Sequence, residues 1–190
     1  MSGPANSAIV VGASAGALEA LSAILPTLPA DYPRAVFVVV HVPPATPSLL
    51  PELLRAKCRL RVCEAEDKEP AMPGTIYVAP PDYHLQVEAD KCISLSNDLP
   101  VMYSRPSIDV LFETAADAYG ENLIGVVLTG ANDDGAAGLR AVLAAGGTGF
   151  VQRPQDAYAQ GMPQAAMKAC PAAQVLPLAD IARHLQEVAA

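Results

Sequence analysis

Positive charge is scarce in this sequence, and its scarcity excludes two classes of partner. There are 12 Lys and Arg against 20 Asp and Glu, which gives a net charge of −8. A chain this acidic has few basic side chains that could neutralise phosphates. We therefore expect no nucleic-acid partner. For the same reason the chain is poorly suited to an anionic membrane surface.

Long apolar runs are also missing. No stretch approaches the roughly 20 apolar residues that a membrane-spanning helix needs. The first residues, MSGPANSAIVVGAS, lack the basic segment and the long apolar run of a signal peptide. We therefore expect a cytoplasmic protein with no direct membrane insertion.

Cysteine is sparse and is not arranged for metal binding. None of Cys58, Cys63, Cys92 and Cys170 forms a C-x-x-C pair, and no His lies at zinc-ligand spacing from them. Reduced thiols in a reducing compartment are the expected state. The cysteines therefore give no sign of a zinc site.

What the sequence does contain is apolar and periodic. Its 190 residues are 52% apolar, which suits one domain over residues 1–190. Continuous apolar strands alternate with helical patterns, which indicates a parallel sheet covered on both faces. Turn residues divide 74–96 into three short runs typical of an antiparallel hairpin or meander. The predicted fold is a doubly wound, mostly parallel α/β sheet (Rossmann-like) with an antiparallel hairpin insert. Strands are expected at 8–12, 35–41, 59–65, 123–129 and 148–152, and helices at 16–28, 48–57, 106–119, 134–145 and 178–188.

The first predicted strand runs directly into a helix through Gly12-Ala13-Ser14-Ala15-Gly16. This matches G-x-S-x-G in the strand–turn–helix context of a nucleophilic serine, where small residues leave room for a sharp turn. A plain turn that caps a helix is the simpler interpretation. A dinucleotide site is disfavoured, because Ser14 replaces the second glycine of the phosphate fingerprint and the next strand ends in His41 instead of an acid.

Two further polar positions follow predicted buried strands. His41 comes directly after Val38-Val39-Val40, and the segment 129–136 (TGANDDGA) joins a strand to a helix. A lone His is often structural, and Asp133 or Asp134 could simply cap the helix. Paired acids could bind Mg²⁺, but no carboxylate at an adjacent strand end completes such a site. A serine, a histidine and an acid at one sheet edge are what a catalytic triad requires.

The other histidines fit this edge poorly. His84 lies in the predicted antiparallel insert, and His184 lies in the last helix among solvent-side residues. The chain order Ser, Asp, His of the α/β-hydrolases would require His184 as the base. Its helical context argues against that assignment.

Several segments in one order resemble the catalytic domain of the chemotaxis protein-glutamate methylesterases, the CheB family. They run from about residue 8 to residue 185: VVGASAGALEAL, VVVHVPP, LRVCEAED, PGTIYVAPPDYHL, RPSIDVLFETAA, GVVLTGANDDGAAGL and GMPQAA. The resemblance implies Ser14 as nucleophile, His41 as general base and Asp134 as orienting acid. It also implies backbone N–H groups near Ala15 and Ala131 around the oxyanion.

The resemblance implies hydrolysis of glutamate methyl esters on chemoreceptors, with deamidation of receptor glutamines as a related reaction. It implies no cofactor and no metal. A separate response regulator or kinase is a further expected partner. Ala15 and Ala17 stand where the family usually has Thr and Gly, and Ala131 stands where Met is usual. The family's usual receiver domain has no counterpart here, because about seven residues precede the first predicted strand, so the sequence is either a stand-alone domain or a piece of a longer chain. Without a receiver domain we expect an open active edge and basal activity that does not depend on phosphorylation. The alternatives are a non-catalytic signalling module with the same fold and a small-molecule carboxylesterase.

Overall fold

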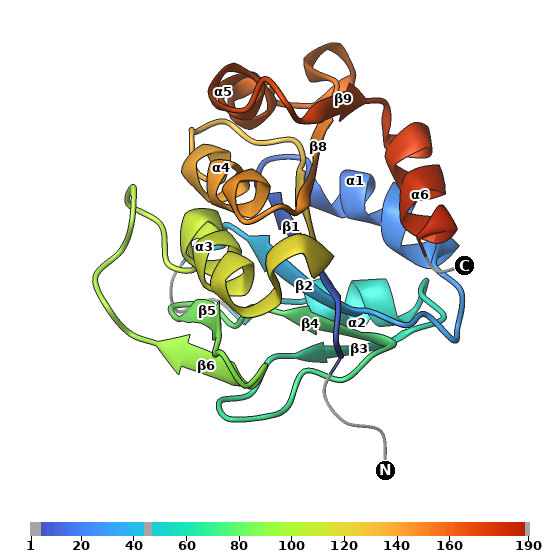
Figure 1. Ribbon diagram of the computed structural model, residues 1–190, viewed down its shortest axis with the longest axis vertical. Helices are drawn as coiled ribbons and strands as arrows, with labels where there is room; N and C mark the ends of the chain where they lie inside the picture. Colours follow the sequence, from blue (N-terminus) through green and yellow to red (C-terminus); the bar gives the residue numbers. More distant parts are fainter. Residues whose placement is uncertain (1–4, 44–46, 189–190) are drawn as a thin grey trace.

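A computed structural model describes residues 5–43 and 47–188, and its centre is a parallel sheet. The strand order is β3-β4-β2-β1-β7-β8-β9, with every neighbouring pair parallel. Helices lie on both faces of this sheet (Figure 1). The predicted doubly wound α/β fold is therefore confirmed. The strands are β1 (Ala8–Ala13), β2 (Ala35–Val40), β3 (Arg61–Glu64), β4 (Thr75–Val78), β7 (Leu123–Val127), β8 (Thr148–Gln152) and β9 (Gln174–Leu176).

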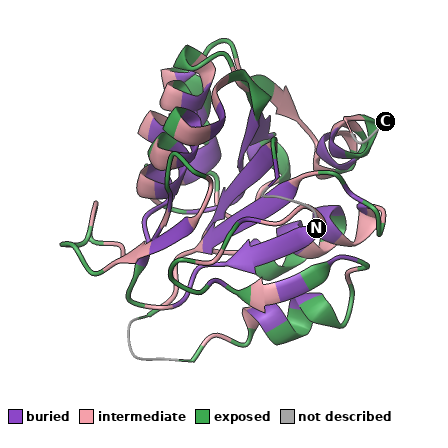
Figure 2. Cartoon of the chain, turned by 60° about the horizontal axis from the view of Figure 1, so that its bottom comes forward, coloured by how far each residue is buried: buried purple, intermediate pink, exposed green. Residues whose placement is uncertain are grey.

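The helices divide into two layers that bury opposite faces of the sheet. One apolar cluster joins the sheet to α1 (Ala17–Ile24), α2 (Leu50–Arg55) and α6 (Leu178–Glu187). The other joins it to α3 (Ile108–Tyr119), α4 (Ala136–Ala144) and α5 (Gly161–Ala169). Figure 2 shows the strands as a buried layer between partly exposed helices. Short 3-10 turns occupy Leu25–Thr27, Gly120–Asn122 and Pro154–Asp156.

Strand β1 explains why the sequence reads as continuously apolar there. Every residue from Ala8 to Ala13 is buried. Successive side chains of a strand point to opposite faces, so Ile9 and Val11 enter one cluster while Val10 enters the other. A strand covered on both faces needs apolar residues at every position.

The antiparallel insert is smaller than predicted. The segment TIYV forms β4, which pairs in parallel with β3 and β2. Only β5 (His84–Val87) and β6 (Ile93–Ser96) form the antiparallel hairpin. Interpreting all of 74–96 as a meander was therefore wrong at its start. All four residues of β4 are buried, which is the mark of a central parallel strand rather than of an alternating one.

Several element boundaries also differ from the predictions. The helix expected over 16–28 ends at Ile24, and a 3-10 turn containing Pro26 follows it. The helix expected from residue 106 begins at Ile108, with Ser107 as its N-cap. Helix α5 and strand β9 were not predicted. Pro44, the last residue of the VVVHVPP segment, lies outside the described residues.

No helix within residues 5–43 and 47–188 is long and apolar enough to cross a bilayer.

Candidate active site

Ser14 lies one residue beyond β1, between the ends of the two strands that flank it. Parallel pairing continues past the strand ends, since His41 N–H donates to Ala13 O (3.3 Å) and Ser14 N–H donates to Thr129 O (2.9 Å). Adjacent strands lie about 4.8 Å apart. The central strand thus brings Ser14 beside His41 on one side and beside Thr129 on the other.

Glycines shape the chain on either side of Ser14. Gly16 has φ +82°, a left-handed conformation that side chains rarely adopt, and it serves as the N-cap of α1. A Cβ at Gly130 would overlap Met162 Sδ and lie 3.1 Å from Ser14 Cβ. Small residues were predicted around Ser14 because the turn leaves little room. Gly16 fits this prediction, and Gly130 is a further position where a side chain would not fit.

His41 and Asp134 form a short, largely buried hydrogen-bonded pair. His41 Nε2 lies 2.7 Å from Asp134 Oδ2, with the side chains 12% and 0% exposed. Asp134 follows β7, which is separated from β2 by β1. The segment 129–134 therefore crosses the end of β1 to bring the carboxylate to the imidazole.

Asp134 is held by a cradle at the start of α3. Its Oδ1 accepts from Ser107 Oγ (3.0 Å) and from Asp109 N–H (2.9 Å), and its Oδ2 accepts from Ile108 N–H (2.7 Å). Burial raises the pKa of the Asp134 carboxyl, but the hydrogen bonds from His41 and from the backbone of Asp109 and Ile108 outweigh it. The pKa is lowered as a result, so the carboxylate is ionised and can only accept hydrogen bonds from its neighbours.

Asp109 is a second buried acid, behind Asp134. Its Oδ1 accepts from Gly135 N–H (2.9 Å) and from Gly138 N–H (2.6 Å), which ties α3 to the start of α4. Burial raises the pKa of Asp109 most, and the negative charge of Asp134 adds to this effect against the opposing hydrogen bond from Gly138. The result is a pKa of about 6. Asp109 thus braces the loop that carries Asp134.

The imidazole of His41 presents its remaining nitrogen, Nδ1, away from Asp134. Because Asp134 can only accept, Nε2 carries the shared hydrogen and Nδ1 is left as an acceptor. Asn132 Nδ2 lies 3.4 Å from Nδ1, and Asn132 Oδ1 accepts from Asp134 N–H (3.2 Å). Among the described residues, Ser14 and His41 share no hydrogen bond. The predicted pairing of the imidazole with Asp134 is present, while direct pairing with Ser14 is not.

Two backbone N–H groups near Ser14 are free of partners in the part of the chain described. Neither Ala15 N–H nor Ala131 N–H has an acceptor among residues 5–43 and 47–188. The loop that carries Ala131 is fixed, since Gly130 N–H donates to Ala159 O (3.1 Å) and Met162 N–H donates to Gly130 O (2.9 Å). Unpaired N–H groups on a rigid loop can bind a developing negative charge.

An apolar hollow of about 410 Å³ opens beside Ser14. Val42, Leu49 and Leu53 are among the side chains that line it. Leu49 is 62% exposed and Leu53 is 44% exposed, so this apolar lining is open to solvent. The hollow can therefore receive apolar parts of a molecule whose reacting group lies at Ser14.

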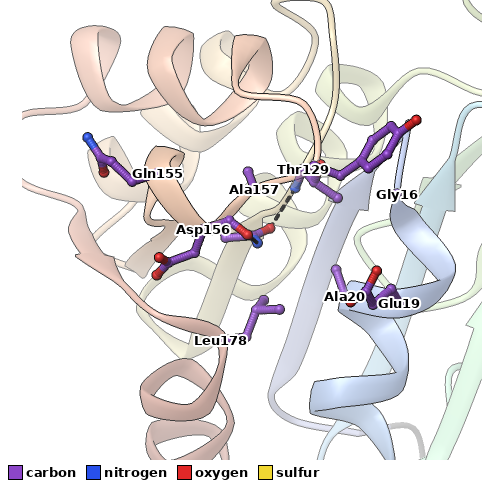
Figure 3. A pocket seen from close by; sticks show the side chains of 10 residues that line it. Gly16, Glu19, Ala20, Thr129, Gln155, Asp156, Ala157 and Leu178 are labelled. Atoms are coloured by element: carbon purple, nitrogen blue, oxygen red, sulfur yellow. Dashed lines mark hydrogen bonds between the residues drawn. The ribbon is translucent and has the colours of Figure 1, made fainter.

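A second hollow, of about 240 Å³, is lined by Gly16, Glu19 and Ala20 at the start of α1 (Figure 3). Thr129 borders it, and the dashed line marks Thr129 N–H donating to Gln152 Oε1 (2.9 Å). Ser14, His41 and Asp134 do not line it. Gln152 is 2% exposed and holds Thr129, whose carbonyl in turn holds Ser14 N–H.

Residues outside the predicted set complete the surroundings of Asp134. Ser107, Asp109 and Asn132 were not predicted as site residues, although a serine before an apolar helix is a recognisable N-cap signal. His84 is buried and accepts from Ser107 N–H, so it lies closer to this edge than predicted. His184 stacks on Phe150 and lies near Glu187, away from Ser14. Among the described residues, no three His, Cys, Asp or Glu side chains could hold a metal ion.

Comparisons with known proteins point to a single family. The family model for CheB methylesterases matches residues 9–185. A Leptospira interrogans protein provisionally named as a protein-glutamate methylesterase/protein-glutamine glutaminase is 46% identical over 92% of this chain and 91% of its own. Burkholderia lata protein-glutamate methylesterase/protein-glutamine glutaminase 3 is 41% identical over 93% of this chain, which spans 49% of that relative's length. The crystal structure of the Thermotoga maritima CheB methylesterase catalytic domain has a TM-score of 0.92 at 34% identity, covering 99% of this chain and 100% of that one.

Proposed function

We propose that this chain, which belongs to the CheB methylesterase family, is a serine hydrolase that removes methyl esters from protein glutamate side chains. The substrate we infer is a methylated chemoreceptor or a related signalling protein. The names of its relatives include protein-glutamine glutaminase, so deamidation of receptor glutamines is a second reaction of the same site. The observation that carries the proposal is the His41–Asp134 pair (2.7 Å) beside the strand end that bears Ser14.

The first half of the reaction forms an acyl-enzyme. Ser14 Oγ attacks the ester carbonyl carbon, and His41 Nδ1 accepts the hydroxyl proton as the new C–O bond forms. The tetrahedral intermediate then collapses: the bond to the methoxy oxygen breaks, and His41 returns the proton to release methanol. Ionised Asp134 stabilises the imidazolium that exists between these steps.

The second half regenerates the serine. Water attacks the acyl carbon and gives its proton to His41, and the bond to Ser14 Oγ breaks as His41 returns a proton to it. A glutamate carboxylate is the product. A glutamine substrate follows the same course, with ammonia in place of methanol.

The Ala15 and Ala131 N–H groups are the oxyanion donors in this proposal. Both intermediates place a negative charge on the former carbonyl oxygen, and rigid N–H groups stabilise such a charge without reorganising. Their lack of an acceptor among the described residues supports this role. The apolar hollow beside Ser14 then receives side chains that flank the ester.

We also propose the domain extent, location and partners that this function requires. Residues 1–190 are one catalytic domain that works in the cytoplasm, where the signalling ends of receptors are accessible. A separate response regulator or kinase would bring the enzyme to its substrate. No cofactor or metal takes part in the chemistry we propose.

The test is release of methanol from a methylated receptor fragment by the purified protein. Ser14→Ala and His41→Ala are each expected to lower kcat by a factor on the order of 10³ or more, and the double variant should be little worse than either. Labelling of Ser14 by a serine-directed covalent probe is the second readout. Undiminished turnover by Ser14→Ala would refute covalent catalysis. Inertness toward both ester and probe would favour a binding module.

A further inference from the structure

His84 lies outside the proposed triad, and both of its ring nitrogens are engaged. The residue begins β5 and is 1% exposed. Ser107 N–H lies 3.1 Å from Nδ1, and Leu99 O lies 3.1 Å from Nε2. A backbone N–H can only donate and a carbonyl can only accept, so Nδ1 is the acceptor and Nε2 carries the hydrogen. The two partners therefore select one neutral tautomer of His84.

The residue that His84 holds is the first member of the cradle around Asp134. Ser107 N–H binds His84, and Ser107 Oγ donates to Asp134 Oδ1 (3.0 Å). The next two residues, Ile108 and Asp109, donate their N–H groups to the same carboxylate. A displacement of Ser107 would move all three donors, because they are consecutive along the chain.

His84 also fixes the segment that borders His41 on its other side. Leu99 O accepts from His84, and residues 100 and 103–106 of the same segment line a small hollow together with His41. Arg105 anchors this segment as well, donating to Asp82 Oδ1 (2.7 Å) and to the carbonyls of Asn97 and Asp98. One imidazole thus joins the hairpin insert, the loop beside His41 and the start of α3.

We propose that His84 is a positioning residue for the Asp134–His41 pair. It touches no reacting atom and acts through Ser107, whose backbone it holds so that the cradle presents Asp134 to His41 at hydrogen-bond distance. The inference rests on the proposed function, because it assigns His84 a part in the same reaction. If His84 has this part, the antiparallel hairpin contributes to catalysis although it lies about 70 residues after Ser14 in the sequence.

Two amide substitutions separate the hydrogen bonds of His84. In His84→Asn, the amide oxygen occupies nearly the place of Nδ1 and can still accept from Ser107 N–H. In His84→Gln, the amide nitrogen reaches nearly the place of Nε2 and can still donate to Leu99 O, while Ser107 N–H loses its acceptor. We expect His84→Gln to lower kcat on a small methyl ester about 10- to 100-fold with KM little changed, because Ser107 N–H is left without its acceptor and the cradle around Asp134 can shift. His84→Asn should stay within about three-fold of the parent.

The matched controls are His184→Asn and His184→Gln, made on α6 where the histidine side chain is 35% exposed. Both should leave kcat and KM unchanged. A readout that does not depend on turnover is the proton NMR resonance of the His41 Nε2 hydrogen, which is shared with Asp134. It should broaden or shift in His84→Gln and persist in His84→Asn.

The outcomes are separable. Equal turnover and an unchanged His41 resonance in His84→Gln, measured well below its Tm, would overturn the positioning role. Losses in both His84 variants that follow only the unfolded fraction would also overturn it, because a structural histidine predicts that result. Absence of turnover in the parent protein would instead count against the proposed function, and the NMR comparison would still decide the role of His84.

Discussion

Asp109 and Asp134 show how two neighbouring carboxyls come to differ. Asp134 accepts four hydrogen bonds, one of them from an imidazole, and its pKa is lowered. Asp109 accepts through one oxygen only among the described residues, and burial raises its pKa to about 6. The hydrogen-bond donors, and not the depth of burial, decide which acid keeps its charge.

The stability of the protein should depend on pH through Asp109. Its pKa is about 6 in the folded protein against 3.8 as the ordinary value. Between pH 3.8 and about 6 the folded protein keeps a proton that the unfolded chain has released. The stability that Asp109 contributes in its protonated form is therefore fully present below pH 3.8 and is lost as the pH rises through about 6. This difference corresponds to about 3 kcal/mol at most.

Asp109→Asn removes this titration and can keep the acceptor for Gly135 and Gly138. We expect the stability of the variant relative to the parent to improve by about 1–3 kcal/mol between pH 4 and pH 7. Urea denaturation at several pH values measures this change. Asp117→Asn, at an exposed carboxyl on the same helix, is the control and should give a constant difference. A constant difference for Asp109→Asn as well would contradict the raised pKa.

At the scale of elements, the contact between β1 and α3 sets the distance between Ser14 and the cradle. Gly12 lies against the side chain of Ile108, the first residue of α3, and a Cβ at position 12 would overlap Ile108 Cγ2 and lie 2.9 Å from Ile108 Cδ1. Ile108 is fully buried and branched at Cβ, so it has little freedom to move aside. The absence of a side chain at Gly12 is what allows α3 to lie this close.

Gly12→Ala should therefore harm both stability and turnover. We expect a loss of about 1–3 kcal/mol from overpacking and a fall in kcat as the start of α3 moves away from Asp134. Ile108→Ala, combined with Gly12→Ala, should restore part of the turnover by relieving the overlap. Thermal melts and ester hydrolysis of the single and double variants provide the measurement.

Gly125→Ala is the matched control in β7, where an added Cβ would lie 2.9 Å from Leu139 Cδ1, away from Ser14. It should reduce stability with little effect on kcat in the folded protein. Equal kcat losses in the two glycine variants would show that turnover follows general packing rather than the place of α3.

The sequence predicted those elements that carry a strong local pattern. The strands at 8–12, 35–41 and 148–152 were predicted nearly to the residue, because both-face burial requires unbroken apolar runs. Parallel pairing of β4 was missed, since which strands pair is decided by tertiary contacts and not by residues 75–78 alone. Helix α5, which contains Gly161 and Pro163, lacks a strong helical pattern of its own.

In the candidate site, too, residues with a local sequence pattern could be predicted and residues placed by tertiary contacts could not. Ser14, His41 and an acid at position 133 or 134 could be proposed because each lies at or just beyond the end of a predicted buried strand, and the family resemblance then selected Asp134. The cradle of Ser107, Ile108 and Asp109 acts largely through backbone N–H groups, which every residue type except proline carries. His84 could not be placed, because its role depends on how the hairpin packs against α3.

Over the whole molecule, the net charge of −8 opposes binding of an acidic substrate. For a methylated peptide rich in glutamate, we expect kcat/KM to rise as NaCl is increased from about 10 to 200 mM, because salt screens the repulsion. A neutral methyl ester, tested in parallel, should show little dependence on salt. A fall in kcat/KM with salt for the acidic peptide would mean that a local basic surface outweighs the net charge.

The order of the strands has a consequence for synthesis of the chain. β1 and β2 are neighbours in sequence and in the sheet, so Ser14 and His41 can come together soon after they leave the ribosome. β7, which precedes Asp134, adds to the opposite edge of β1, and the cradle for Asp134 comes from α3, made just before it. A nascent chain can therefore bring Ser14 and His41 together before Asp134 has been made. Under the proposed mechanism, an unfinished chain would remain chemically silent until its second half has folded onto its first.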